Sequence, residues 1–197
     1  MKSIDVKGTA RTETGKKACR DIRKAGAVPC NLYGEAKDEK GLPVALSFTA
    51  TQEELRKLVY SPDIYSVNLN IDGKECKAIM KELQFHPVTD RLLHVDFYEI
   101  TETKPIVMEV PIKLNGLAEG VRAGGKLAAS VRKLKVRAPY TAIPEQLNID
   151  VTNLGLGKTI KVGELSFEGL EMVTSPSVVV CQVKMTRSAM SAAAKAE

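Results

Sequence analysis

The chain has 197 residues, of which 44% are hydrophobic and 27% are charged, and its formal net charge is +5 at pH 7. This composition is typical of a soluble globular protein with one or two domains, and it excludes a disordered polymer, a collagen and a disulfide-rich miniprotein. No apolar run approaches the roughly 18 residues of a membrane helix, and no apolar stretch follows the basic N-terminal residue as in a secretory signal. We therefore expect a cytosolic protein with no membrane partner.

The cysteines and histidines show no catalytic or metal-binding pattern. The four cysteines are separated by 11, 46 and 105 residues and form no C-x-x-C pair, so we expect reduced and mostly buried thiols. Residues 155–159 (G-L-G-K-T) match a phosphate-binding loop only in part, because Thr152 stands where that loop needs glycine, and we interpret them as a turn. The sequence thus predicts no enzyme, no catalytic residue, no metal, no cofactor and no small-molecule substrate.

The first part of the chain predicts strands around one basic helix. Residues 2–11 alternate between apolar and polar side chains, which is typical of a strand, and residues 27–34 and 42–48 predict two more strands. Within residues 16–26, small and apolar residues fall at helical spacing on one side while lysines and arginines fall on the other. This segment therefore predicts a short amphipathic helix.

A second helix and a hairpin follow. The capping-box pattern T-Q-E-E, followed by leucines at helical spacing, predicts a helix over residues 51–60. Residues 65–71 alternate strictly, an Asp-Gly pair follows at 72–73, and a second extended run begins at Glu75, which together predict a β-hairpin. A strand over residues 91–100 completes this part of the chain.

The second half of the chain predicts an all-β domain. Residues 101–105 are polar and end in proline, so we place a domain boundary there. Beyond it, strands are expected over 107–112, 133–137, 147–151 and 177–184, with turns at Gly116, Gly120, Gly124 and Gly125. We therefore expect three parts, which are a domain over 1–100, an all-β domain over 101–187 and an Ala-rich tail over 188–197.

Positive charge is concentrated at the start of the chain, where the first 34 residues hold eight basic and three acidic residues. The basic helix carries Lys16, Lys17, Arg20, Arg23 and Lys24. Such a run by itself is typical of a solvated helix face. Arg11 before the helix and Tyr33 after it favour a polyanion site instead, because Lys and Arg bind phosphates and Tyr can stack on a base or donate to it.

His94 and Asp96 share one face of the expected strand, because side chains alternate with period two. The pair could orient a catalytic imidazole, form a buried structural contact, or recognise a polar ligand at the surface. No nucleophile stands in a recognisable motif nearby, so we prefer recognition. If the fold brings them together, the pair completes a mixed constellation with Arg11, Arg20, Arg23 and Tyr33.

A second basic region lies in the second half. No acidic residue occurs between Glu119 and Glu145, whereas six basic residues do: Arg122, Lys126, Arg132, Lys133, Lys135 and Arg137. These residues predict either a solvated strand face with edge protection, or a second surface that faces RNA or protein.

Several motifs, taken in order, resemble a known family. The first is R-x-x-x-G-K at 11–16, continued by R-x-x-R at 20–23 and P-x-x-x-Y-G at 29–34. The others are Q-F-H-P at 84–87 with H-V-D-F at 94–97, and E-G-V-R-A-G-G at 119–125. Over residues 1 to about 187, this order resembles the bacterial large-subunit ribosomal proteins that bind 5S ribosomal RNA, a family that includes general stress protein CTC, in their long two-domain form.

The resemblance implies a mainly β fold, with an N-terminal β-barrel that carries two short helices and a second all-β module. It also implies that the barrel docks on an internal-loop helix of 5S ribosomal RNA. The positions that match RNA-contacting residues of the family are Arg11, Arg20, Arg23, Tyr33, His94 and Asp96, and, less firmly, Lys16, Lys17, Lys24 and Gln84. Two departures are Asp21, where members often carry a basic residue, and Lys81-Glu82, which replaces a more usual Gln-Asp pair.

We therefore expect a non-enzymatic structural component of the large ribosomal subunit, cytoplasmic and ribosome-associated. Its N-terminal domain is expected to bind 5S ribosomal RNA, and its second domain to contact neighbouring ribosomal proteins. The alternative is a protein-interaction, assembly or stress module whose second β domain binds a ribosomal neighbour while the N-terminal charge steers it. Loss of its complexes on nuclease treatment discriminates between the two.

Overall fold

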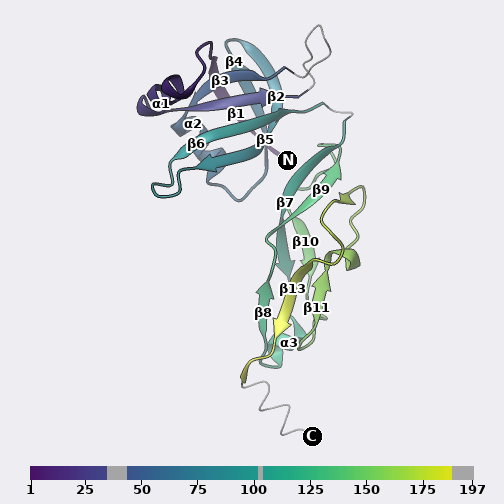
Figure 1. The fold of residues 1–197 in the computed structure, drawn as a ribbon. Coiled ribbons are helices and arrows are strands. Elements are labelled where there is room, and N and C mark those ends of the chain that lie inside the picture. The colour runs from purple at the N-terminus through teal and green to yellow at the C-terminus, as the bar shows by residue number, and fades with distance from the viewer. Residues whose placement is uncertain (35–43, 102–103, 188–197) are drawn as a thin grey trace, which may run out of the picture. The chain divides into compact units, whose positions relative to one another are not determined.

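The computed structural model describes residues 1–34, 44–101 and 104–187, and the chain divides into two compact units, Met1–Lys104 and Pro105–Glu197. The expected tail over 188–197 and part of the expected boundary lie outside the described residues. Both units are built mainly from strands (Figure 1), so the predicted mainly β fold is confirmed. None of the helices in the described part of the chain is long and apolar enough to cross a membrane.

Six strands of the first unit close into a barrel in the spatial order β1-β3-β2-β6-β5-β4. Neighbours run antiparallel except for two parallel pairs, β1 with β4 and β2 with β6. Closure leaves no long sheet edge unpaired, which removes a common route to aggregation. The strands are β1 (Lys2–Ala10), β2 (Ala27–Tyr33), β3 (Leu46–Thr51), β4 (Tyr65–Ile71), β5 (Lys74–Phe85) and β6 (Leu92–Glu99).

The predicted hairpin is confirmed as β4 and β5. Its two turn residues, Asp72 and Gly73, have φ values of 48° and 87°. Positive φ at both positions is what a tight hairpin turn requires, and it explains the Asp-Gly pair. The predicted strand over 42–48 is partly wrong. Residues 42–43 lie outside the described residues, residues 44–45 are not in a strand, and β3 continues to Thr51 because it pairs with β2 as far as Ala27.

The two predicted helices of the first unit are present, both shorter than expected. Helix α1 (Lys16–Lys24) ends before Gly26, whose φ of 80° turns the chain toward β2. Helix α2 (Gln52–Val59) begins after Thr51, whose hydroxyl accepts a hydrogen bond from the Glu54 amide at 3.4 Å. This contact is the N-terminal half of the predicted capping box.

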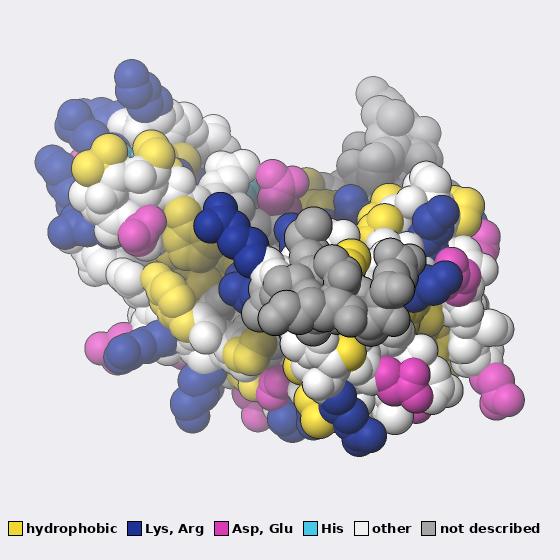
Figure 2. Space-filling model, turned by 90° about the horizontal axis from the view of Figure 1, so that it is seen from below, with side chains coloured by type: hydrophobic (Ala, Val, Ile, Leu, Met, Phe, Trp, Pro, Cys, Tyr) yellow, Lys and Arg dark blue, Asp and Glu magenta, His cyan; other side chains and the backbone are white. Residues whose placement is uncertain are grey.

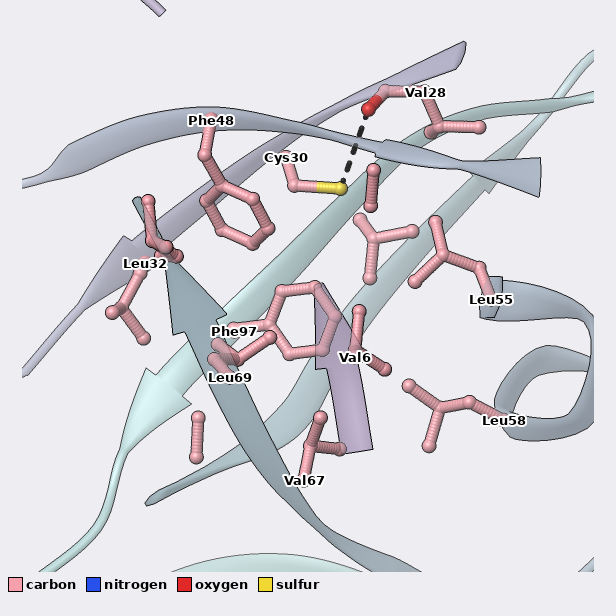
Figure 3. Close-up of a cluster of buried hydrophobic side chains, with 14 of the residues drawn as sticks. Val6, Val28, Cys30, Leu32, Phe48, Leu55, Leu58, Val67, Leu69 and Phe97 are labelled. Atoms are coloured by element: carbon pink, nitrogen blue, oxygen red, sulfur yellow. Dashed lines mark hydrogen bonds between the residues drawn. The ribbon is translucent and has the colours of Figure 1, made fainter. Parts of the chain in front are cut away.

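The barrel interior is filled by alternate residues of every strand. Phe48 and Phe97 are fully buried, and their ring centroids lie 5.7 Å apart. Leu55 and Leu58 of α2 point into the same cluster (Figure 3). Gly8 lies on β1 beside this cluster, and a Cβ there would meet Phe48 at 2.6 Å, so the large ring requires glycine on the neighbouring strand.

The second unit contains a four-stranded sheet in the order β10-β7-β9-β12 and a three-stranded sheet in the order β11-β13-β8. The expected all-β character is confirmed, and within residues 105–186 the helical elements are the single turn α3 (Glu119–Arg122) and the short 3-10 helix η1 (Val162–Glu164). The turn expected at Gly120 is therefore wrong, because this residue lies in α3. The strands are β7 (Ile106–Asn115), β8 (Lys126–Ala129), β9 (Lys133–Ala138), β10 (Leu147–Asp150), β11 (Thr159–Lys161), β12 (Glu171–Met172) and β13 (Val179–Lys184).

Candidate nucleic-acid interface

A row of polar residues crosses four neighbouring strands of the barrel. Ser47 of β3 lies opposite Asn31 of β2, Asn31 lies opposite Asp96 of β6, and Asp96 lies opposite Glu82 of β5. Their sequence neighbours on each side are mostly buried, and because side chains alternate, these residues face outward. The Ser47 hydroxyl donates to Asn31 Oδ1 at 3.1 Å, which fixes the amide within the row. We call Ser47, Asn31, Asp96 and Glu82 the polar row.

His94 and Gln84 lie next to the polar row. His94 stands two residues before Asp96 on the same face of β6, as the sequence predicts, and its Nδ1 lies 3.4 Å from Asp96 Oδ1. The two side chains are 18% and 22% exposed, so the pair is partly shielded and still reachable from solvent. Gln84 lies directly opposite His94 on β5 and is exposed. The strand pairing therefore brings these three predicted residues together.

The register of β5 against β6 shifts twice, once between Met80 and Glu82 and again between Gln84 and Phe85. The first shift leaves Lys81 as an extra residue on the bulged strand. Bulges bend a strand and increase its twist, and they re-aim the side chains beside them. Glu82 and Gln84, which stand between the two shifts, therefore occupy an irregular and locally bent part of the barrel wall.

Tyr33 ends β2 beside the polar row. Its ring meets that of Tyr98 edge to face, with centroids 5.8 Å apart. Burial raises the pKa of the Tyr33 hydroxyl, and the negative charges of Asp96 and Glu82 raise it further. The phenol therefore keeps its proton at neutral pH and can donate a hydrogen bond to a ligand oxygen or ring nitrogen.

Two arginines attach the basic helix to the barrel. Arg11 Nη1 donates to the Sγ of Cys19 in α1 at 3.1 Å, and Arg23 Nε donates to the carbonyl oxygen of Leu93 in β6 at 3.0 Å. Arg11 is partly buried, and its Nε is buried without a hydrogen-bond partner among the described residues. Arg11 is therefore placed to hold α1 as much as to meet a ligand.

The remaining cations of α1 are exposed. No residue of the helix is buried, and Figure 2 shows dark blue side chains gathered at one edge of the first unit. The Arg20 Nε lies 3.8 Å from Asp21 Oδ1, and both side chains are largely exposed, so the pair is screened by water and weak. Lys16, Lys17 and Lys24 form no ion pair within the described part of the chain. The helix therefore presents cations that are available to a polyanion.

All ten residues predicted from the sequence lie in the first unit, on or next to α1, β2, β5 and β6. The sequence analysis missed Asn31, Ser47 and Tyr98, and it noted Glu82 only as a departure from the pattern of the family. The signal for Asn31 was available, because it alternates with buried Cys30 and Leu32 on β2. Ser47, by contrast, joins the row only through its pairing with Asn31, which the local pattern does not reveal.

The basic residues on β9 are not part of this constellation. Lys135 lies 3.8 Å from Glu109, and Arg137 lies 3.4 Å from Glu171. These contacts favour the solvated, charge-balanced strand face over a second ligand surface at β9. Among the described residues there is also no group of three or more His, Cys, Asp or Glu side chains that could hold a metal ion.

Each of the two units matches a known protein family. Residues 6–97 match the model of the Ribosomal L25p family, and residues 105–187 match the model described as Ribosomal protein TL5, C-terminal domain. The chain is 65% identical over 196 residues to the large ribosomal subunit protein bL25 of Phocaeicola vulgatus, covering 100% of this chain and 99% of that protein. It is 59% identical over 201 residues to the bL25 protein of Bacteroides thetaiotaomicron, covering 100% and 99%. The chain therefore belongs to the ribosomal L25p family, whose members are structural proteins of the large ribosomal subunit and not enzymes.

Proposed function

We propose that the first unit binds 5S ribosomal RNA, and that the protein is held in this way in the large subunit of cytoplasmic ribosomes. The observation that carries the proposal is the arginine bond from α1 to β6, which places exposed cations next to the polar row. The ribosomal names of the relatives support it.

The cations of α1 supply the phosphate contacts. Each phosphate that a Lys or Arg neutralises releases counterions, so these contacts give affinity that falls with salt. They carry little sequence information, and their role is to position the barrel face against the RNA backbone.

Selectivity comes from the barrel face. The A-form major groove is too deep and narrow for side chains, so recognition proceeds through the minor groove, the 2′-hydroxyls and distorted internal loops. For hydrogen bonds to RNA bases and 2′-hydroxyls, Tyr33 provides a donor and Asp96 provides an acceptor, and the amide of Gln84 provides both. The locally bent part of β5 is more complementary to an irregular RNA loop than to a regular RNA duplex.

A titration of the purified full chain tests this proposal. It is measured against 5S ribosomal RNA and against an unrelated structured RNA of the same length, each at two salt concentrations. The expected result is a preference for 5S ribosomal RNA that persists at the higher salt. Equal binding of both RNAs that collapses with salt would contradict the proposal and leave only a basic patch, and the protein-interaction reading would then be preferred.

A further inference from the structure

Two groups of basic side chains in the second unit differ in their partners. On β9, Lys135 and Arg137 form ion pairs with Glu109 and Glu171. In α3 and the loops and strand ends next to it, five basic residues have no ion pair in the part of the chain that the structure describes, namely Arg122, Lys126, Lys158, Lys184 and Arg187. We call these five residues the β8–β13 cluster.

Two lysines of the cluster lie side by side. Lys126 opens β8 and Lys184 ends β13, and the two residues are directly opposite each other in the antiparallel pair. Both side chains are exposed. Like charges placed directly opposite on neighbouring strands destabilise the pairing. The positive charges of Lys126 and Lys184 therefore repel each other across the strand pair.

Arg122 ends α3, four residues before Lys126, and backbone contacts bring Lys158 and the segment before Arg187 to the same place. Lys158 accepts a hydrogen bond through its carbonyl oxygen from the amide of Val183, the neighbour of Lys184, at 3.0 Å. The hydroxyl of Thr186, which precedes Arg187, donates to the carbonyl oxygen of Gly124 at 2.6 Å. Figure 1 shows α3 and the adjoining ends of β8 and β13 at one end of the second unit.

The loops that carry the cluster are closely packed. A Cβ on Gly120 would meet the backbone of Gly155 at 2.7 Å, and a Cβ on Gly125 would meet the carbonyl oxygen of Gly120 at 2.6 Å. Only glycine allows this approach, so the glycine-rich segment holds the two loops together. The loops and strand ends over 116–126, 155–158 and 183–187 contain one acidic residue, Glu119, against five cations.

We propose that the β8–β13 cluster binds the phosphate backbone of an RNA, as a second contact that does not depend on the barrel face. Five cations with one carboxylate among them, on firmly packed loops, match the dense negative charge of a nucleic-acid backbone better than a single acidic side chain of a protein. A phosphate bound between Lys126 and Lys184 would also remove the repulsion between these two ammonium groups, which is present in the protein without RNA.

Two triple variants with equal changes in charge test the proposal. The first is Lys126→Gln with Lys158→Gln and Lys184→Gln, and the second, the control on β9, is Lys133→Gln with Lys135→Gln and Arg137→Gln. Both are made in the full chain with Arg20→Ala and Arg23→Ala, which weaken the barrel face. The probe is an RNA duplex of about 20 base pairs, long enough to offer many phosphates.

The cluster variant is expected to lose affinity by about tenfold or more, and its slope of log affinity against log salt to become shallower by about two. The β9 variant is expected to lose less than about twofold. Equal losses in the two variants, or no loss in either, would overturn the proposal. Selectivity for 5S ribosomal RNA is measured separately in the unmodified chain, so failure of one proposal is distinguishable from failure of the other.

A single substitution separates binding from folding. Lys126→Glu places opposite charges across β8 and β13, so the melting temperature of the second unit is expected to rise by about 1–5 °C. Affinity for the duplex is expected to fall in the same variant. A variant that is more stable and still binds as well as the unmodified chain would overturn the proposal.

Discussion

The Nε of Arg23 donates a hydrogen bond to the carbonyl oxygen of Leu93 at 3.0 Å. The bond joins the last turn of α1 to β6 one residue before His94. This single contact therefore fixes the cationic helix relative to the face of β6 that carries His94 and Asp96. No residue of α1 is fully buried, and Ala18, Cys19 and Ile22 are only half-buried, so this helix is held by less packing than a helix with a buried face. The hydrogen bonds of Arg11 and Arg23 therefore contribute more to the attachment of α1 than they would in a helix with a buried face.

Replacing Arg23 is expected to lower the affinity for RNA and to loosen the attachment of α1 to the barrel. Arg23→Ala removes a candidate phosphate contact and the bond to Leu93, so affinity for 5S ribosomal RNA should fall further than in Arg20→Ala. Amide hydrogen exchange in α1 should also become faster, because the helix loses an anchor. Arg23→Lys keeps the charge and loses the Nε donor, so it should speed exchange with a smaller loss of affinity. Unchanged exchange in both variants would show that the bond does not hold the helix.

Arg20→Ala is expected to weaken RNA binding through phosphate contact alone. The slope of log affinity against log salt should become shallower by about 0.7–0.9, the value for one phosphate. Lys57→Ala, at an exposed position on α2, is the matched loss of one charge and should leave the slope unchanged. An unchanged slope in Arg20→Ala would remove this residue from the phosphate contacts.

Asp96→Asn is expected to reduce selectivity more than total affinity. The substitution keeps the size of the side chain and removes the charge that lies 3.4 Å from His94 Nδ1. A carboxylate can accept from base amino groups through both oxygens, whereas an amide can do so through one. The measurement is the ratio of affinities for 5S ribosomal RNA and an unrelated RNA. Equal losses for the two RNAs would contradict a recognition role for Asp96.

The two units are expected to lose stability separately. Phe97→Ala removes a fully buried ring from the barrel core and should cost the first unit about 3–5 kcal/mol. Leu134→Ala removes a fully buried side chain from the second unit and should cost it about 2–5 kcal/mol. Chemical denaturation followed by hydrogen exchange in each unit should show one transition shifted by each variant. Coincident shifts of both transitions would mean that the units unfold together.

The barrel is expected to become less stable at high pH. Burial raises the pKa of the Cys30 thiol from 9.0 to about 12. Below pH 9 both states hold the proton, whereas between pH 9 and about 12 the unfolded thiol ionises and the folded one does not. The free energy of unfolding should therefore fall across this window, by about 1.4 kcal/mol per pH unit from this group.

Cys30→Ala isolates that contribution, because the variant lacks the titrating thiol while Tyr33 and the other groups remain. The difference in unfolding free energy between the two proteins should change with pH above 9 and stay constant below it. Thiol labelling of the unmodified protein should likewise proceed at Cys30 only after unfolding. A pH-independent difference would show that the thiol is not shielded in the folded barrel.

Much of the fold could be predicted because its signals are local. Strict alternation and an Asp-Gly pair defined the β4–β5 hairpin, and the capping pattern at Thr51 located the start of α2. The errors lie where tertiary context overrides a local pattern. Gly120 reads as a turn residue, yet it lies in α3, where it packs against the backbone of Gly155 from a distant loop.

The candidate site shows the same division. The charge pattern and the ordered motifs of the sequence identified the residues of α1 together with Tyr33, His94 and Asp96. Barrel closure decided which residues stand beside them, because it sets the order of strands that are distant in the chain. It placed Ser47 next to Asn31 and Asn31 next to Asp96, and it brought Arg23 to Leu93. The residue types and periodicities of the sequence determine each element, whereas neighbourhood across strands is a property of the closed barrel that no local pattern specifies.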